Sequence, residues 1–573
     1  MRPPRSTLDG PQFAGWTSDA AVRPRYRVRT EPDVKIPLTD GTVLVGDLHR
    51  PVTDQPQPAL LGWSPYNKDL MPTGVPAPFN EPGDVTHLAR CGYPVAVVNA
   101  RGTGRSGGTL PPEMFGPTEM DDLRATIAWL ASRPWCDGRV AMTGMSYFAI
   151  SQLMAAGHRI PHLAAIAPFG AATDLYRMLA YHNGTQTSGF LGRYIAINGA
   201  AQRARLHPVL RHALGHLVGT RPAQAAIRAA MARALPQLTR RLPVPGPWLR
   251  RWSAYALDAP LDGPLYRDSS AWPRLPDIDV PVLIGSEWSM VGLHLPGAFD
   301  AWHAVTAPKK MFIGPRWTRW PFLRYQKEIV AFYDHVLRGA DNGYAALPAV
   351  RYWLHGAERW ESAEDWPVPD ARPWRLHLTG DPQAGLASEA GEQTIERSWA
   401  AVPPGMEYPG AFKDGHVARY RTAPLPVDTH LVGPAHLTLR MTSTAMDTHV
   451  QVRLSDVAPD GRPTVISVGW LAASHRTEDE DRTTSSEIVH DHTRPVPLVP
   501  GEPAVLRLSL APFAQLVRAG HRLLLEIGSD PRRLAPPASD YVYFGMAGPP
   551  YAARNTVLHG SSLELSVRGE TPR

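Results

Sequence analysis

The stretch RVAMTGMSYFAIS (residues 139–151) decides the fold prediction, because it joins an apolar strand to a helix through one sharp turn. The run 139–144 is typical of a strand buried on both faces of a parallel sheet. Gly144 and Ala149 keep two positions around Ser146 small, as a nucleophile elbow requires. The backbone N–H of Tyr147 would then face a developing oxyanion. Taken alone, the pattern also fits an ordinary turn with a cap serine.

The surrounding segments alternate between strand and helix patterns. YPVAVVNARG (93–102) is a second buried apolar run, and EMDDLRATIAWLASR (119–133) has helical spacing with acids in its first turn. The pair Asp40-Gly41 indicates a hairpin near the start of the chain. Strand–helix–strand alternation over residues 90–175 predicts a right-handed, mainly parallel α/β sheet.

Two later regions change character. Residues 175–275 are rich in Ala, Arg and Leu, with AAIRAAMARALPQLTRRL at helical spacing, which predicts a helical cap over the sheet. From about residue 346 the chain reads as short alternating strands, which predicts an all-β jelly roll. We therefore expect an α/β core in two parts (1–174 and 276–345), a cap (175–275) and a β domain (346–573).

The composition excludes several function classes. The chain has 573 residues, 43% of them hydrophobic and 20% charged, which is ordinary for a globular protein of several domains. The net charge is +6, without a basic run interleaved with aromatics, so we expect no nucleic-acid partner. No apolar window is long enough for a membrane span and no signal peptide is recognisable. Cys91 and Cys136 form no CxxC motif, which favours a reducing, cytoplasmic location.

The expected partner is a small, mainly hydrophobic molecule held in a cleft between cap, core and β domain. We expect no cofactor and no metal, since the HDH sequence at 490–492 has no third ligand at suitable spacing. The oligomeric state stays open, with a homo-oligomer as one option.

A set of motifs in fixed order carries a family resemblance. They are SPYNKD (64–69), NARGTGRSGGT (99–109), GMSYFAISQ (144–152), FYDHVLRG (332–339) and DTHVQVRLSDVAPDG (447–461). In this order the chain resembles the CocE/NonD family of cocaine esterase and X-Pro dipeptidyl-peptidase. The resemblance implies an α/β-hydrolase core with a helical cap and a jelly roll. It also implies that the protein hydrolyses esters or amides through Ser, His and Asp. It implies Ser146 as nucleophile, and the Tyr147 N–H with the Tyr66 hydroxyl as oxyanion hole.

The chain departs from this family at both partners of the serine. The family places its acid two residues after a Trp, and PVLIGSEWSMVGLHLPGAF (281–299) has Met290 there. A thioether cannot orient or charge-stabilise an imidazole. The family's histidine loop corresponds to FIGPRWTRWPF (312–322), which contains no histidine; Thr318 or Ile313 takes the place, depending on the alignment.

Other residues are candidates for the missing acid or base. His294 and Glu287 lie on the acid's own segment, and His182 lies at the start of the cap. Three functions stay open. The first is an acyl hydrolase or acyltransferase with an atypical triad. The second is a non-hydrolytic enzyme that cyclises, eliminates or rearranges its substrate in the same pocket. The third is an inactive relative that binds a ligand or partner.

Overall fold

The computed structural model describes most of the chain. The residues described are 24–71, 81–202, 204–205, 207, 244–316, 325–381, 385–390, 397–403, 415–530 and 546–572. The stretch AAIRAAMARALPQLTRRL, expected to be helical, lies outside them, as does Thr318.

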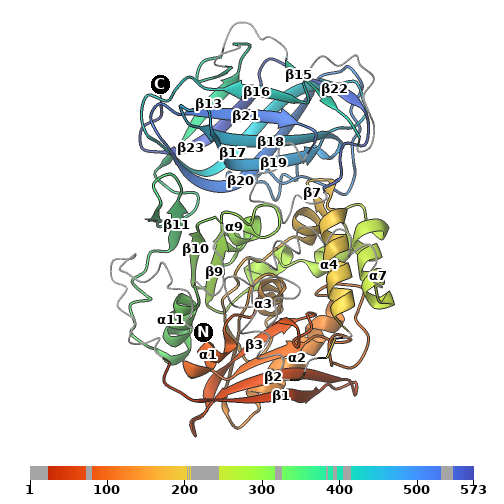
Figure 1. The fold of residues 1–573 in the computed structure, drawn as a ribbon, viewed down its shortest axis with the longest axis vertical. Coiled ribbons are helices and arrows are strands. Elements are labelled where there is room, and N and C mark those ends of the chain that lie inside the picture. The colour runs from red at the N-terminus through yellow and green to blue at the C-terminus, as the bar shows by residue number, and fades with distance from the viewer. Residues whose placement is uncertain are drawn as a thin grey trace.

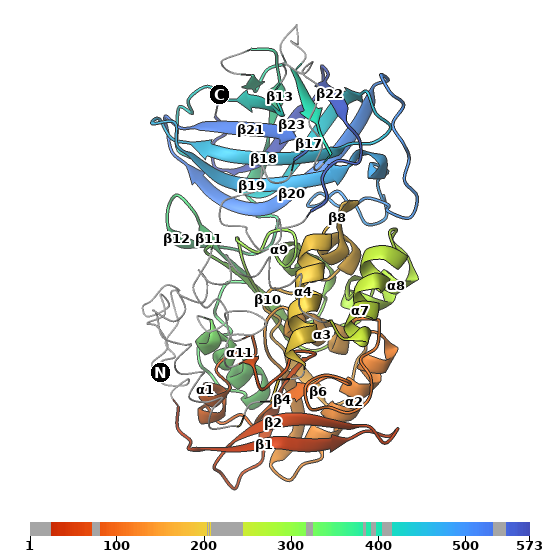
Figure 2. The same cartoon turned by 45° about the vertical axis from the view of Figure 1, so that its right-hand side comes forward.

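The lower half of the molecule is a ten-stranded sheet flanked by helices (Figures 1 and 2). The strands from β4 to β11 pair in parallel, and β1, β2 and β12 add antiparallel edges, so the expected mainly parallel sheet is confirmed. The predicted hairpin turn lies between β1 and β2, where Gly41 has a φ of +83°. The strand order is β1 (Val28–Pro37), β2 (Val43–Pro51), β4 (Val95–Asn99), β3 (Gln57–Ser64), β5 (Cys136–Met142), β6 (Leu163–Ile166), β9 (Val282–Glu287), β10 (Lys309–Gly314), β11 (Val350–Leu354) and β12 (Arg359–Ala363).

Helices cover both faces of this sheet, which explains why its central strands are apolar throughout. One buried cluster joins the sheet to α2 (Pro117–Ala131), α3 (Tyr147–Gly157) and α9 (Leu295–Ala304). A second cluster joins it to α1 (Val85–Arg90) and α11 (Gln326–Arg338).

The region 175–275 is mainly helical where it is described, as expected for a cap. It also contains a two-residue hairpin, β7 (Tyr181–His182) with β8 (Thr185–Gln186), that its composition did not predict. Its helical elements are the π-helix η2 (Tyr176–Ala180), α4 (Ser188–Ala201), α7 (Gly246–Ser253), the π-helix η3 (Ala254–Asp258), α8 (Pro264–Ser269) and the 3₁₀ helix η4 (Trp272–Asp277).

The upper half is the jelly roll, in which two antiparallel sheets enclose a separate core (Figure 1). One sheet contains β14 (Leu386–Ala387), β13 (Ala371–Leu378), β23 (Ser562–Arg568), β17 (Thr429–Ser443), β22 (Ala553–Val557), β15 (Arg397–Ala401) and β20 (Ala504–Val517). The other contains β16 (Val417–Arg421), β21 (Arg522–Gly528), β18 (His449–Val457) and β19 (Pro463–Ala472), which leads into the 3₁₀ turn η5 (Ala473–His475).

The two halves are closely joined. Strands β11 and β12 follow residue 345 and still extend the core sheet. Val468, Trp470 and Ala514 of the jelly roll belong to the same buried cluster as α2, α3 and α9. The division at residues 174, 275 and 345 therefore stays a proposal about domains.

Candidate active site

Ser146 lies at the turn between β5 and α3, at the carboxyl end of a parallel strand. Its φ of 60° and ψ of −121° lie in a region that non-glycine residues rarely adopt. Such a conformation costs about 1–3 kcal/mol and persists only where surrounding contacts enforce it. The chain therefore holds Ser146 on a strained elbow, as the local sequence predicted.

Contacts on both sides fix the elbow. Gly144 has a φ of +124°, and a Cβ there would lie 2.5 Å from Phe148 Cβ, so only glycine fits. The Ser146 N–H donates to the carbonyl of Phe169 (3.1 Å). The Gln152 amide donates to the Gly144 carbonyl (3.0 Å) and accepts from the Ala167 N–H (2.8 Å). The turn is thus tied to both its own helix and the next strand.

The backbone N–H of Tyr147 opens α3, and no acceptor for it is found among the described residues. A donor at a helix N-terminus is suited to stabilise negative charge on a substrate oxygen. The Tyr147 side chain is directed elsewhere, because its hydroxyl donates to the buried Glu119 carboxylate (2.9 Å). Only the main chain of Tyr147 can therefore serve as an oxyanion donor.

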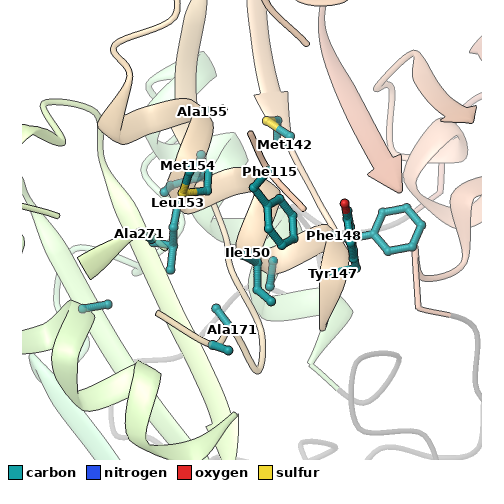
Figure 3. Packing of buried hydrophobic residues seen from close by; sticks show 14 of the residues in the cluster. Phe115, Met142, Tyr147, Phe148, Ile150, Leu153, Met154, Ala155, Ala171 and Ala271 are labelled. Atoms are coloured by element: carbon teal, nitrogen blue, oxygen red, sulfur yellow. The ribbon is translucent and has the colours of Figure 1, made fainter. Parts of the chain in front are cut away.

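Aromatic residues gather near the elbow, and Figure 3 shows three of them, Phe115, Tyr147 and Phe148. The ring of Tyr66 packs edge-on against Tyr147 (5.8 Å between centroids), Phe148 (6.0 Å) and Tyr194 of the cap (6.1 Å). The main chain of Tyr66 is also fixed, because the Asn99 side-chain amide donates a hydrogen bond to the Tyr66 carbonyl. The structure thus places Tyr66 beside the elbow residues, in an apolar setting.

Met290 occupies the loop between β9 and α9, where the family pattern has its acid. Its sulfur packs on Gly170, where an added Cβ would be 3.0 Å from Sδ, and accepts a weak hydrogen bond from Ser286 Oγ (3.9 Å). Gly170 directly follows Phe169, whose carbonyl receives the Ser146 N–H. The thioether therefore lies in the wall next to the elbow.

The loop after β10, where the family pattern has its histidine, is described only to residue 316. Arg316 turns toward the jelly roll and donates to the carbonyls of Val465 and Ile466. Burial lowers the pKa of Arg316 to about 10. Within the described residues, no imidazole and no carboxylate is hydrogen-bonded to Ser146 Oγ.

Comparison with known proteins places these features in a family. The family description "X-Pro dipeptidyl-peptidase (S15 family)" matches residues 40–318, and "X-Pro dipeptidyl-peptidase C-terminal non-catalytic domain" matches residues 342–568. A cocaine esterase from Rhodococcus sp. (strain MB1 Bresler) is 26% identical over 87% of this chain and 90% of its own length. The chain belongs to the CocE/NonD family of α/β hydrolases.

Solved CocE/NonD-like structures share the fold. A CocE/NonD family hydrolase from Staphylococcus aureus superposes with a TM-score of 0.73 at 20% identity, covering 94% of this chain and 93% of that one. An aminopeptidase from a marine sediment Thaumarchaeota archaeon gives a TM-score of 0.69 at 19% identity, covering 96% and 98%. The expected combination of hydrolase core and C-terminal β domain is thereby confirmed.

Against this CocE/NonD background, the substitute acids and bases occupy different places. His294 is the N-cap residue of α9 and packs on Gly170 beside Met290; its Nδ1 has no partner, and burial lowers its pKa to about 3. Glu287 is the last residue of β9 and is fully buried. The ring of His182 contacts Trp470 of the jelly roll, and its Nδ1 bonds to the carbonyl of Arg177 (2.8 Å).

These placements bear on the chemistry of each candidate. A general base works best with a pKa near the working pH. Burial lowers the pKa of His294 to about 3 and that of His182 to about 4, so both are weak bases. Of these two, only His294 lies in the wall that also holds Met290 and Gly170. The role of each candidate stays a prediction.

One buried acid beside the elbow was not predicted from the sequence. The carbonyl of Glu81 accepts the Met145 N–H (3.0 Å), and its carboxyl oxygen Oε2 has no hydrogen-bond partner. Burial raises the pKa of Glu81 well above its usual value, because desolvation disfavours the carboxylate form. The flanking sequence FNEPGD reads as a surface turn, so it gave no sign of a buried acid.

The described residues hold no group of three or more His, Cys, Asp or Glu side chains arranged to bind a metal ion. Among the helices that the structure describes, none combines the length and apolar character needed to span a bilayer.

Proposed function

We propose that this CocE/NonD protein is an enzyme acting on a small, mainly hydrophobic ester, amide or carbonyl compound, with an atypical catalytic site. The observation that carries the proposal is the strained elbow, in which Ser146 has a φ of 60° next to the available N–H of Tyr147. These two features support an electrophilic carbonyl as the group that is bound. The aromatic residues around Tyr66 support an apolar substrate.

The proposed reaction uses oxyanion stabilisation more than nucleophile activation. With Met290 at the acid's position and Thr318 or Ile313 at the histidine's, no imidazole or carboxylate of the described residues is hydrogen-bonded to Ser146 Oγ to take its proton. Loss of general base catalysis costs about 10²–10⁴ in rate. Part of the rate enhancement survives in triad variants through the oxyanion hole and substrate binding. We therefore propose slow turnover of generic activated esters.

Met290 also supports a second candidate function. A thioether beside the elbow gives the pocket an apolar, uncharged wall where a hydrolase would hold a carboxylate. Such a pocket can polarise a carbonyl through the Tyr147 N–H and the Tyr66 hydroxyl without forming an acyl-enzyme. Cyclisation, elimination or rearrangement would then replace hydrolysis.

Labelling with a fluorophosphonate probe, followed by intact-protein mass spectrometry, tests the first candidate. An acyl hydrolase or acyltransferase forms an adduct on Ser146 that the Ser146→Ala variant does not form. Absence of the adduct in the folded parent protein would favour the non-hydrolytic enzyme. An inactive ligand-binding protein would bind substrate candidates without product in the same samples.

Location and partners follow as further proposals. We propose a cytoplasmic protein, on the ground that Cys91 and Cys136 are both buried free thiols. The natural partner is proposed to be a small-molecule substrate, and the oligomeric state is left to measurement by light scattering.

A further inference from the structure

A cavity of about 240 Å³ lies between α9 of the core, the start of the cap and the jelly roll. Figures 1 and 2 both show α9 directly below β19 and β20, where this cavity is found. Its lining includes none of Ser146, Tyr147 and Tyr66. The volume suits a ligand smaller than a typical drug molecule. Its apolar wall includes Trp272, Phe299, Trp366, Val468, Trp470 and Ile488.

Two carboxyl groups from different domains meet in this wall. Asp300 of α9 and Glu487 of the jelly roll both line the cavity and are hydrogen-bonded to each other, which requires a proton between them. The Thr173 hydroxyl donates a further hydrogen bond to Asp300 Oδ2. Burial and the neighbouring charge of Asp300 raise the pKa of Glu487 to about 8. Burial also raises the pKa of Asp300 from its usual value, so full ionisation of the pair is disfavoured.

The nearby guanidinium groups are already engaged. Arg482 pairs with Asp174 (3.0 Å) and stacks on the Trp272 ring at 3.7 Å. Arg177 pairs with Asp174 (2.8 Å) and Asp262 (2.7 Å). Arg482 lies near enough to lower the pKa of both Asp300 and Glu487, but among the described residues neither carboxyl has a cation within ion-pair distance. An anionic ligand would meet repulsion there, while a cation would be attracted.

A second feature is the aromatic wall of the cavity. Tryptophan and phenylalanine rings in the wall favour an organic cation over a metal ion, because they offer π-faces and no ligating atoms.

We propose that this cavity is a second ligand site, which takes a small organic amine as its ammonium ion between Asp300 and Glu487. The ammonium group replaces the shared proton and donates to both carboxylates, and the displaced proton leaves to solvent. The apolar part of the amine packs against the tryptophans. This site does not depend on the function proposed for Ser146.

Proton displacement fixes the sign of the pH dependence. The free pair holds its proton up to about pH 8, whereas the bound pair is fully ionised. Binding therefore releases up to one proton below that pH, and affinity rises with pH by at most about tenfold per unit. Burial lowers the pKa of His303, another lining residue, so it stays neutral in this range. The other charged groups facing the pair are Asp174, Arg177 and Arg482.

Isothermal titration of the full-length protein with benzylamine tests the proposal. We expect benzylamine to bind at least about tenfold more tightly than the isosteric benzyl alcohol, since charge-assisted hydrogen bonds are worth about 1.5–3 kcal/mol. Its affinity should rise from about pH 6.5 to about pH 8, with proton release measured in buffers of different ionisation enthalpy. Equal affinity for the alcohol, tighter binding of benzoate, or affinity independent of pH would each overturn the proposal.

Variants locate the site. Glu487→Gln should weaken benzylamine binding by about tenfold or more and abolish proton release. The matched control, Glu502→Gln, changes an exposed glutamate of the same domain and should leave both unchanged. Ser146→Ala should also bind benzylamine normally, which separates this site from the elbow. Unchanged binding and proton release in a folded Glu487→Gln protein would place the amine elsewhere and overturn the assignment.

Discussion

The sulfur of Met290 and the backbone of Gly170 are in direct contact, at the place where the family pattern has a carboxylate. Gly170 has a φ of +60°, and a Cβ there would lie 3.0 Å from Met290 Sδ and 3.6 Å from His294 Cβ. Gly170 therefore lets the thioether and the imidazole pack in one wall. If Met290 takes the place of the acid, as we propose, this wall carries a thioether where a complete triad has a carboxylate.

Restoring an acid at position 290 should change the pKa of His294 more directly than it changes the activity. In Met290→Asp we expect the pKa of His294, now lowered by burial to about 3, to rise, because a nearby carboxylate favours the imidazolium form. The ring signals in a pH titration by NMR measure this shift. Met290→Leu is the control and should leave the pKa unchanged. A pKa of His294 that does not move in Met290→Asp would show that the two side chains do not interact.

Rigidity of the elbow can be tested at Gly144. Gly144→Ala should destabilise the protein by about 2–5 kcal/mol, through backbone strain at a φ of +124° and the clash with Phe148. Gly41→Ala is the control, because Gly41 also has a positive φ but open space around it, and should cost about 1–2 kcal/mol. Urea unfolding gives both values. Equal losses would mean that packing at the elbow is loose.

Tyr66 and Ser146 should differ in how much they contribute to the reaction rate, once a substrate is known. Tyr66→Phe removes a hydroxyl that can polarise a carbonyl, and we expect it to reduce the single-turnover rate by about 10²–10³. Ser146→Ala should be milder, because no imidazole or carboxylate of the described residues is hydrogen-bonded to Ser146 Oγ to act as its base. Tyr551→Phe, at an exposed tyrosine, is the control. Complete loss of activity in Ser146→Ala, together with a trapped acyl-enzyme in the parent protein, would instead establish covalent serine catalysis.

Buried neutral histidines should make the protein sensitive to mild acid. Burial lowers the pKa of His182 to about 4, below the value of about 6.5 in an unfolded chain. The unfolded state therefore binds a proton that the folded state refuses, and the free energy of unfolding falls as the pH drops between these values. From about pH 7 to about pH 5, His182 alone accounts for a loss of about 2 kcal/mol.

Denaturant titrations at these two pH values check this contribution. His182→Gln should lose about 2 kcal/mol less than the parent protein over this pH range. His559→Gln, at an exposed histidine, is the control and should follow the parent. An identical pH dependence in all three proteins would show that His182 takes up a proton without opening the fold.

Local pattern explains why the elbow and the parallel sheet could be predicted. Gly144, Ser146 and Ala149 lie within six residues, and the helix predicted over 119–133 is α2, shifted two residues earlier by Pro117 at its first turn. The alternation that marks β11 and β12 as strands does not say which sheet they join. Both were assigned to the β domain from the sequence, yet they pair with the core sheet.

Contacts between distant segments could not be predicted in this way. Asp300 lies in an apolar helix pattern and Glu487 in a polar loop of the β domain, and nothing in either segment indicates that the two carboxyls meet. Glu81 was missed for the same reason, because its burial depends on the elbow that packs over it. The triad replacements that we propose at Met290 and Thr318 rest only on the resemblance, since both are unremarkable residues in their own segments.

The apolar cluster shared by the two halves has a consequence for how the protein can be cut and rebuilt. Val468 and Trp470 fill part of the same interior as the helices of the core, and Arg316 ties the loop after β10 to the neighbouring strand β19. A shortened chain that ends after the hydrolase part would expose this apolar surface to solvent, and such a surface favours self-association. Core and jelly roll therefore share one buried interface, and pieces exchanged with relatives must carry both sides of it.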